Sequence, residues 1–287
     1  MIALIRTEFT KAARRTRTLV VALILVGLPT LIVVAINAHG HRRGDGDAGE
    51  GLFRLAQQSG YLVPAAVLSV MSGFLLVVIA GTFAGDSVAG DAAWGNLRYL
   101  LLRPVPRGRL LVAKAIVAGI LIWAATILVA LSGLVAGLVL FGAKTVTVPR
   151  FSSVASPTLL GPLVVSTFHL GHSVLLLRTG IATAYVAFGF TALLALGTFF
   201  STLSDTSASA IGATVGVYIV SEILDGITQL GSIRYLFPTH YLDAWQSMFT
   251  ANQYSHDMIA GIVVQLAYLV VFGAIAVVWF RRKDIRS

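Results

Sequence analysis

Six long stretches of this chain contain no charged residue, and apolar residues dominate each of them. The stretches are Thr18–Ala38, Leu55–Gly85, Ala115–Ala143, Thr179–Ser204, Thr206–Ser221 and Met258–Phe280. A helix needs about 20 apolar residues to cross the hydrocarbon core of a bilayer, and five of the stretches reach that length. Apolar residues continue the shorter fifth stretch to Leu230, past Glu222 and Asp225. Because lipid offers no partner to backbone N–H and C=O groups, the pattern predicts helices.

The pattern therefore predicts an all-α integral membrane protein with a single transmembrane domain over residues 1–287. The predicted spans are residues 18–38, 61–85, 115–142, 178–203, 206–230 and 258–280. A cytoplasmic loop at 86–114 and extracellular segments at 143–177 and 231–257 are expected to join them. The last of these is predicted to form short amphipathic or re-entrant helices before the sixth span.

Composition agrees with a membrane protein, since 57% of the residues are hydrophobic and only 11% are charged. About 25% charged residues is usual for a soluble domain. Of the 21 Lys and Arg residues, 14 lie in 1–17, 86–114 and 281–287. Basic residues concentrate on the cytoplasmic side, which places both termini in the cytoplasm. The net charge of +9 is thus a topology signal, and we expect no nucleic-acid partner.

The uncharged residues 151–177 are the ambiguous part of this topology, because they contain two prolines, two histidines and several serines. A seventh span there would move the basic C-terminal tail outside, against the charge rule. We expect an extracellular amphipathic or re-entrant segment instead.

Apolar residues recur at helical spacing in residues 1–17, at Ile2, Ile5, Phe9 and Ala12, with basic residues between them. A basic amphipathic helix beside a span tends to lie among lipid headgroups. The segment is therefore predicted to be an interfacial helix in contact with membrane lipids. The alternative is a solvated, partly frayed start of the first span.

Candidate chemistry is sparse. The chain has no cysteine, which excludes disulfides and thiolate metal sites. It lacks the Walker A, H-E-x-x-H and G-x-S-x-G patterns. The pairs His39/His41 and His169/His172 have metal-ligand spacing, but no third ligand accompanies either. We predict no catalytic, cofactor-binding or metal-binding residue in this chain.

Charged residues at membrane depth are candidates for function. Glu222 and Asp225 lie near the outer end of the fifth span. They are candidate polar residues of a translocation path, and the alternative is that they reach the outer headgroups.

The loop Gly85–Lys114 carries the most specific pattern. Two acids are followed by the amphipathic stretch Trp94–Leu102. The prolines Pro104 and Pro106 come next, and a basic cluster follows them. Proline ends a helix and fixes the direction in which the chain leaves it. A short cytoplasmic helix is predicted here, able to transmit force from a soluble partner to spans two and three. The alternative role is simple anchoring in the headgroups.

This loop resembles the equivalent loop of ABC-2-type exporter permeases. The matching residues are Gly95-Asn96-Leu97-Arg98, Leu100-Leu101, Pro104-Val105, Arg107 and Lys114. Asn96 replaces the usual Thr, and the acid expected just before the Gly is displaced to Asp91. A second match is Pro238-Thr239-His240-Tyr241, and a third is the turn Ser201–Ala210. Together with six spans, the resemblance covers essentially the whole chain.

The resemblance implies the permease subunit of an ATP-driven exporter for an amphiphilic substrate such as a drug or lipid. It implies two separate ATPase subunits that bind ATP and Mg²⁺, a second permease subunit, and no enzymatic activity in this chain. The implied coupling helix, which docks on the ATPase, uses Asp91, Trp94, Leu97, Arg98, Leu101, Pro104 and Arg107. The implied outer re-entrant segment uses Pro238, His240, Tyr241 and Trp245. The expected location is a bacterial cell membrane.

Two other functions fit the same pattern less well. A non-transporting scaffold or sensor would use the inner loop to dock a regulator, and would not depend on ATP. A secondary transporter needs a coupling-ion site at mid-membrane, and the scarcity of buried carboxylates argues against it.

Overall fold

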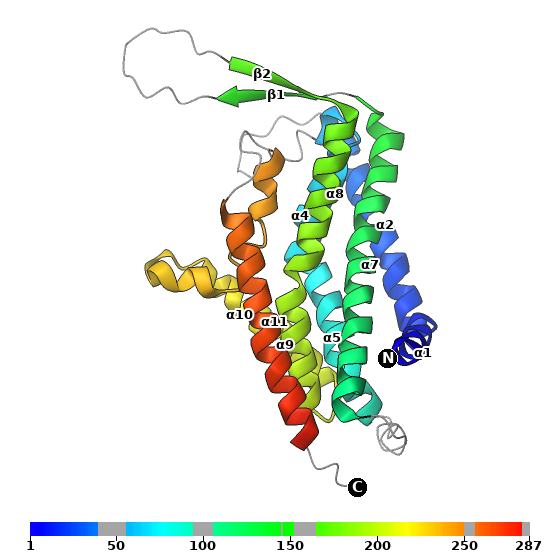
Figure 1. The fold of residues 1–287 in the computed structure, drawn as a ribbon. Helices are drawn as coiled ribbons and strands as arrows, with labels where there is room; N and C mark the ends of the chain where they lie inside the picture. The colour runs from blue at the N-terminus through cyan, green and yellow to red at the C-terminus, as the bar shows by residue number, and fades with distance from the viewer. Residues whose placement is uncertain (40–55, 94–105, 145, 152–164, 250–255, 283–287) are drawn as a thin grey trace.

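The computed structural model describes residues 1–39, 56–93, 106–144, 146–151, 165–249 and 256–282. Six helical segments among these residues are long and apolar enough to cross a membrane. They are α2 (Thr16–His39), α5 (Leu75–Ala93), α7 (Arg107–Phe141), α8 with α9 (His172–Gly189 and Thr191–Leu203), α10 (Ser207–Asp225) and α11 (His256–Arg282). The helices form one elongated bundle (Figure 1). The predicted all-α membrane class with six spans is confirmed.

Helix α5 lies at the centre of the bundle and is the most buried of the six spans. It follows the short helix α4 (Val63–Gly73), from which it is separated by a kink at Phe74 (φ −139°, ψ −58°). α5 packs against α7, α9 and α10, while α2 packs against α7, and α11 against α9. The outer faces of α2, α10 and α11 expose many large apolar side chains, as expected of surfaces that meet lipid.

Glycines allow two pairs of helices, α4 with α7 and α5 with α10, to approach closely. A Cβ added to Gly137 of α7 would lie 2.6 Å from Val63 Cβ and 2.7 Å from Gly60 O. A Cβ added to Gly85 of α5 would lie 2.9 Å from Ile211 N of α10. Small residues are the usual means of close packing between membrane helices, and these glycines pack within one subunit.

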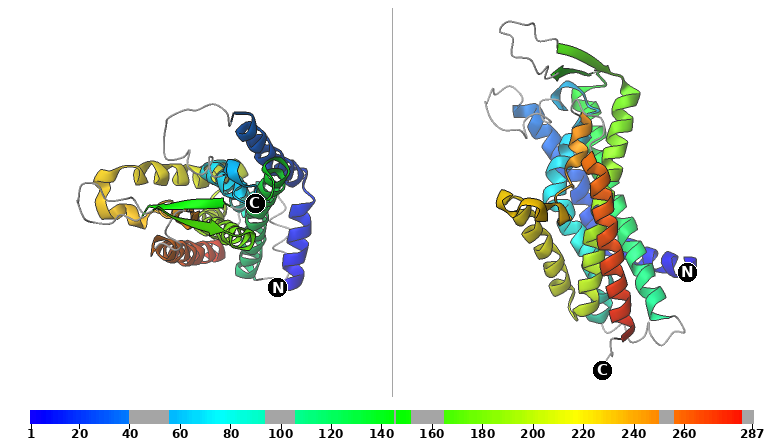
Figure 2. Two further views of the ribbon diagram at one scale, coloured as in Figure 1. Left: turned by 90° about the horizontal axis from the view of Figure 1, so that it is seen from above. Right: turned by 60° about the vertical axis from the view of Figure 1, so that its left-hand side comes forward.

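The N-terminal helix α1 (Ile2–Ala13) projects sideways from the bundle, at an angle to α2 (Figure 2). Helix α1 and the last residues of α11 lie toward the end of the bundle opposite the strands (Figure 1). The helix predicted within residues 1–17 is thus a separate element rather than the start of the first span. Its contact with a membrane surface and the cytoplasmic location of both ends stay predictions.

The inner boundary of the second span differs from the prediction. Helix α5 continues through Asp86 and Asp91 to Ala93, and α7 begins at Arg107, so that much of the predicted loop 86–114 is helical. The predicted span ended at Gly85 with the uncharged stretch, and the two carboxylates beyond it are costly to bury without partners. They are tolerated here because basic side chains from other helices pair with them.

The described part of the segment 143–177 differs from the amphipathic or re-entrant form that was expected for residues 151–177. It contains two antiparallel strands, β1 (Val146–Phe151) and β2 (Val165–Leu170), with Pro149 opposite Thr167. Both strands are rich in β-branched and aromatic residues, which favour extended backbone. The pair lies beyond one end of the bundle (Figure 1), and α8 begins directly after it at His172.

Two 3₁₀ helices precede the last span, η1 (Thr228–Leu236) and η2 (Ala244–Phe249). η1 contains Gly231 at φ +54°, a left-handed conformation that favours glycine. Figures 1 and 2 show η1 projecting sideways part-way along the bundle rather than beyond its end. Short helices were predicted in this region, and their relation to a membrane surface stays a prediction.

Candidate functional site

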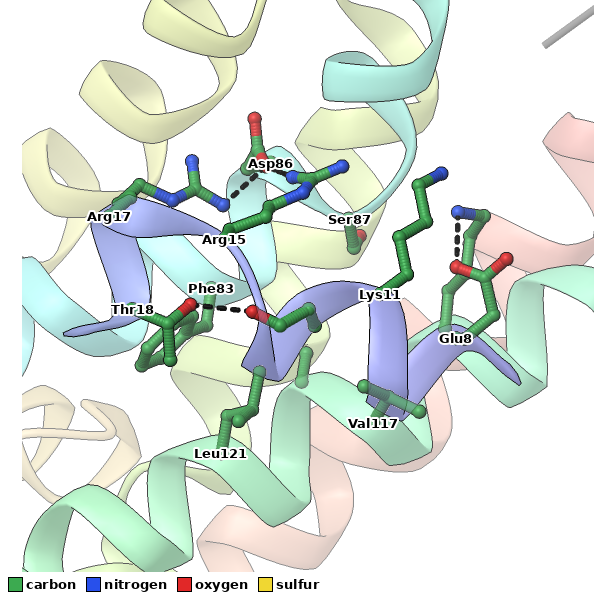
Figure 3. Close-up of a pocket in the computed structure, with 13 residues that line it drawn as sticks. Glu8, Lys11, Arg15, Arg17, Thr18, Phe83, Asp86, Ser87, Val117 and Leu121 are labelled. Atoms are coloured by element: carbon green, nitrogen blue, oxygen red, sulfur yellow. Dashed lines mark hydrogen bonds and ion pairs between the residues drawn. The ribbon is translucent and has the colours of Figure 1, made fainter. Parts of the chain in front are cut away.

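Charged side chains gather where the N-terminal helices meet α5 and α7 (Figure 3). We call this group the inner charge cluster, and its members are Glu8, Lys11, Arg15, Arg17, Asp86, Asp91 and Lys114. The two aspartates belong to α5, and the bases come from α1, from the turn after it, from α2 and from α7. The cluster therefore joins the N-terminal residues 8–17 to α5 and α7, which are distant from them in sequence.

Asp86 anchors the turn between α1 and α2. Its Oδ2 atom lies 2.7 Å from Arg15 Nη1 and 2.5 Å from Arg17 Nη2. The Oγ atom of Ser207, at the start of α10, donates a hydrogen bond to Oδ1 of the same carboxylate. Asp86 is buried, and charge-assisted bonds of this kind are the strong ones. The N-terminal turn is thus tied to both α5 and α10.

Asp91 occupies the other half of the cluster. Its carboxylate contacts Lys114 Nζ and lies 2.7 Å from Lys11 Nζ. Lys114 Nζ also lies 3.0 Å from Glu8 Oε2. Asp91 is 2% exposed and Lys114 is 5% exposed. Buried charges are stable only when they are paired, so this pairing offsets the cost of burying both side chains inside the bundle.

A small cavity of about 50 Å³ lies within the cluster. Figure 3 shows Phe83, Val117 and Leu121 among its apolar lining residues, beside the charged groups. This volume accommodates a few water molecules and is too small for an organic cargo molecule. The charges are paired with one another, which suits a structural role in holding helices together rather than a catalytic one.

The cluster lies at the base of the loop that carries the predicted coupling helix. Asp91 precedes that loop and Lys114 follows it, so their contact ties the helix that enters the loop to the helix that leaves it. The predicted docking residues Trp94, Leu97, Arg98, Leu101 and Pro104 lie outside the described residues. Arg107, the first residue of α7, is half-buried.

Asp91 itself requires a correction. It was predicted to belong to the docking helix, but it is a buried residue of α5 whose carboxylate faces Lys11 and Lys114. Such a carboxylate presents no surface to a partner protein. Asp91 supports the loop from within the bundle.

A second set of polar contacts holds the turn between η1 and η2, which carries the Pro-Thr-His-Tyr motif. We call residues 238–242 the outer turn. Each motif residue bonds to a residue of a helix. Two backbone carbonyls accept hydrogen bonds, Pro238 O from Gln265 Nε2 at 2.8 Å and Tyr241 O from Tyr185 Oη at 2.7 Å. Two side chains also form bonds, Thr239 Oγ1 with Ser221 Oγ at 2.9 Å and His240 Nδ1 with Asp225 Oδ1 at 2.6 Å. The outer turn is therefore fastened to α8, α10 and α11.

Apolar contacts reinforce the outer turn and the helix η2 that follows it. Leu242 packs against Gly189, where an added Cβ would lie 2.5 Å from Leu242 Cδ1. Trp245 is fully buried and meets Phe249 edge to face, with ring centroids 6.0 Å apart. Arg178 Nη1 of α8 donates to the C=O of Met248 at 2.7 Å. Pro238, His240, Tyr241 and Trp245 are thus brought together in one packed unit.

Glu222 and Asp225 have different surroundings. Asp225 bonds to His240 and lies 3.6 Å from Arg234 Nε, so it helps hold the outer turn to the end of α10. Glu222 is exposed on α10. Asp225 therefore has a visible structural role, and a role of either carboxylate in a translocation path stays a prediction.

No group of three or more His, Asp or Glu side chains within the described ranges is arranged to hold a metal ion. His172 instead meets Tyr61 edge to face, with ring centroids 5.3 Å apart. His39 ends α2 and His169 lies in β2, whereas His41 is outside the described residues.

Sequence reasoning missed two residues that organise these sites. Gln265 is the one amide side chain in the uncharged stretch 258–280, and that isolation was an available signal, because amides in membrane helices usually bond to another helix. Lys114 was read as part of the basic inner surface. Its burial depends on acids that are distant in sequence, and no local pattern indicates them.

Comparison with known protein families shows the family to which the chain belongs. The model of a family described as "ABC-2 family transporter protein" matches residues 2–285. No curated protein matches the chain. The match includes the inner charge cluster, the outer turn and all six spans.

Proposed function

Because the chain belongs to the ABC-2 family of transporter proteins and is the membrane-spanning permease of an ABC transporter, we propose that it exports an amphiphilic substrate with energy from separate ATPase subunits. Permeases of this family normally pair with ATP-binding subunits. The proposed assembly contains two ATPase subunits, which hold ATP and Mg²⁺, and a second permease subunit. The proposed location is a bacterial inner membrane, with the inner charge cluster on the cytoplasmic side.

The observation that carries the proposal is the contact between Asp91 and Lys114 at the base of the loop 94–105. A helix in that loop, docked on an ATPase, would push on α5 and α7 together because these helices are tied at its base. α5 packs against three other spans, so its displacement would reach most of the bundle. Such a bundle, with two arrangements biased by a bound partner, is the usual basis of ATP-driven alternating access.

An amphiphilic cargo fits the limited polarity of the bundle. The charged residues of the described spans lie mainly near helix ends, at the inner charge cluster and at Glu222 and Asp225. A strongly charged cargo would need partners along its path, because isolated charges are costly inside a membrane. Stimulation of ATP hydrolysis by a panel of neutral, cationic and anionic amphiphiles tests this part of the proposal.

The decisive experiment measures ATP hydrolysis in lipid nanodiscs that contain this chain with candidate ATPase subunits. Trp94→Ala and Arg107→Ala are compared with the wild type. Trp123→Ala serves as the matched control, since Trp123 lies in mid-α7 with its side chain partly exposed on the apolar surface. We expect the two loop variants to lose most stimulation of hydrolysis and the control to retain it. Failure of any ATPase subunit to co-purify, or equal hydrolysis in all variants, would favour the non-transporting scaffold instead.

A further inference from the structure

The fourth span is interrupted at Phe190, where α8 ends and α9 begins. The first N–H groups of a helix have no partner inside that helix. At this break the N–H of Ala192 donates to Gln265 Oε1 of α11 at 2.8 Å, and Thr191 Oγ1 donates to the C=O of Phe188 at 2.5 Å. Side chains therefore bond to backbone groups at the break, and internal bonds of this kind are what a membrane interior requires of an interrupted helix.

Gln265 uses both ends of its side-chain amide. While Oε1 accepts from Ala192, Nε2 donates to the C=O of Pro238 at 2.8 Å. The chemistry of the partners fixes the orientation of the amide, because an N–H needs an acceptor and a carbonyl needs a donor. Gln265 is 3% exposed, so water does not replace these bonds readily. One side chain thus joins the break in the fourth span to the outer turn.

Helix α9 is in turn fastened to α5, the helix that carries the inner charge cluster. Ser201 Oγ accepts from the N–H groups of Val88 and Ala89, both at 2.9 Å. A Cβ added to Gly197 would lie 3.3 Å from the backbone N of Gly85, so the two helices are in close contact. α9 also runs beside α11 (Figure 1). A displacement of α5 therefore carries α9 with it.

We propose that Gln265 is a positioning residue, which makes the outer turn follow α9 when the inner half of the bundle moves. The contact of Leu242 with Gly189, on the α8 side of the same break, is a second attachment between the fourth span and the outer turn. This inference rests on the proposed function for its ATP-dependent part. Its structural part, the attachment of the outer turn by Gln265, holds for the chain alone.

The experiment uses a single cysteine as a reporter, which is convenient because the chain has none of its own. Thr239→Cys places a thiol of nearly the same size beside Pro238, at a position that is 5% exposed. Its rate of reaction with N-ethylmaleimide reports how often the outer turn leaves its site. Gln265→Met removes both amide bonds and keeps the side-chain length. Leu266→Met, at a 44% exposed position of the same helix, is the matched control.

In the purified chain alone, we expect Gln265→Met to raise the reaction rate about ten-fold, the effect of losing two ordinary hydrogen bonds. Leu266→Met should leave the rate within about two-fold of the parent. If Gln265→Met does not fold, Gln265→Asn replaces it, because the shorter side chain keeps one amide but cannot span both partners. An unchanged rate in a folded variant overturns the attachment, whatever the ATPase does.

The second arm uses the complex with its ATPase subunits in nanodiscs. Trapping with ATP and vanadate should change the reaction rate of the reporter in the parent, and Gln265→Met should abolish that change, whereas Leu266→Met should retain it. A full ATP response in Gln265→Met overturns the positioning role. No ATP response in the parent itself contradicts the proposed function, and is distinguishable because the first arm is unaffected.

Discussion

The ammonium group of Lys114 lies between the carboxylates of Asp91 and Glu8, so that one side chain of α7 holds both α5 and α1. The Asp91 and Lys114 side chains are almost entirely buried. Their contact lies at the base of the loop 94–105, and the N-terminal helix joins the same contact through Glu8. The N-terminal helix, the central helix of the bundle and the start of α7 are therefore held together at one point.

We predict that Lys114→Met lowers the free energy of unfolding by about 3 kcal/mol, because it leaves Asp91 and Glu8 beside each other with less compensating charge. The change is measured by unfolding in mixed micelles with circular dichroism. Lys144→Met is the control, since Lys144 is exposed, and it should change stability by less than about 0.5 kcal/mol. A loss of the same small size for both variants would mean that the buried pair contributes little.

The exposed side of the cluster should behave differently. Arg17 contacts Asp86 at 2.5 Å, but its side chain is 36% exposed, so water and salt screen the pair. We expect Arg17→Gln to cost no more than about 1 kcal/mol, and the cost to shrink as salt rises from 0.05 to about 0.5 M. Unfolding of wild type and Arg17→Gln at both salt concentrations measures this. A loss of stability that does not depend on salt would contradict the expectation that salt screens the ion pair between Arg17 and Asp86.

The spans could be predicted from the sequence because each needs a long apolar stretch, and that requirement is local. The inner end of α5 could not be predicted in this way, because the burial of Asp86 depends on Arg15 and Arg17, about 70 residues earlier in the chain. The strands β1 and β2 were missed for a related reason. Two short apolar segments pair only when a turn brings them together, and alternation over six residues is a weak signal.

The candidate site was predictable to a similar extent. The motif Pro238-Thr239-His240-Tyr241 indicated where the outer turn lies, and the structure shows that His240 in it bonds to Asp225. Its partners come from three helices, and only the three-dimensional arrangement identifies Gln265 and Tyr185 among them. The coupling helix expected within residues 94–105 stays a prediction from sequence alone.

Close packing of α7 against α4 gives a third prediction. Gly137→Val should lower the free energy of unfolding by about 1–3 kcal/mol, because the new side chain would overlap Val63 and the C=O of Gly60 and force the helices apart. Gly216→Val is the matched control, since an added Cβ at Gly216 meets nothing within 4 Å. Both variants are compared by thermal unfolding of the chain in detergent. Equal stability of the two would show that the α4–α7 contact relaxes without cost.

The contact between His240 and Asp225 gives the last prediction. Both side chains are 19% exposed, and the bond of 2.6 Å fastens the outer turn to the end of α10. His240→Phe keeps an aromatic ring between Tyr235 and Tyr241, whose rings meet His240 edge to face, but it removes the bond. We therefore expect a loss of about 1.5–3 kcal/mol in stability, as for other hydrogen bonds to a charged group. His256→Phe, at an exposed position at the start of α11, is the control and should be nearly neutral.

The Asp225→Asn variant separates the bond from ring packing, because it leaves every ring in place. If the bond matters, Asp225→Asn and His240→Phe should each destabilise the chain, and the double variant should cost clearly less than the two single losses added together. Full additivity would show that the two residues act independently and that ring packing alone holds the turn.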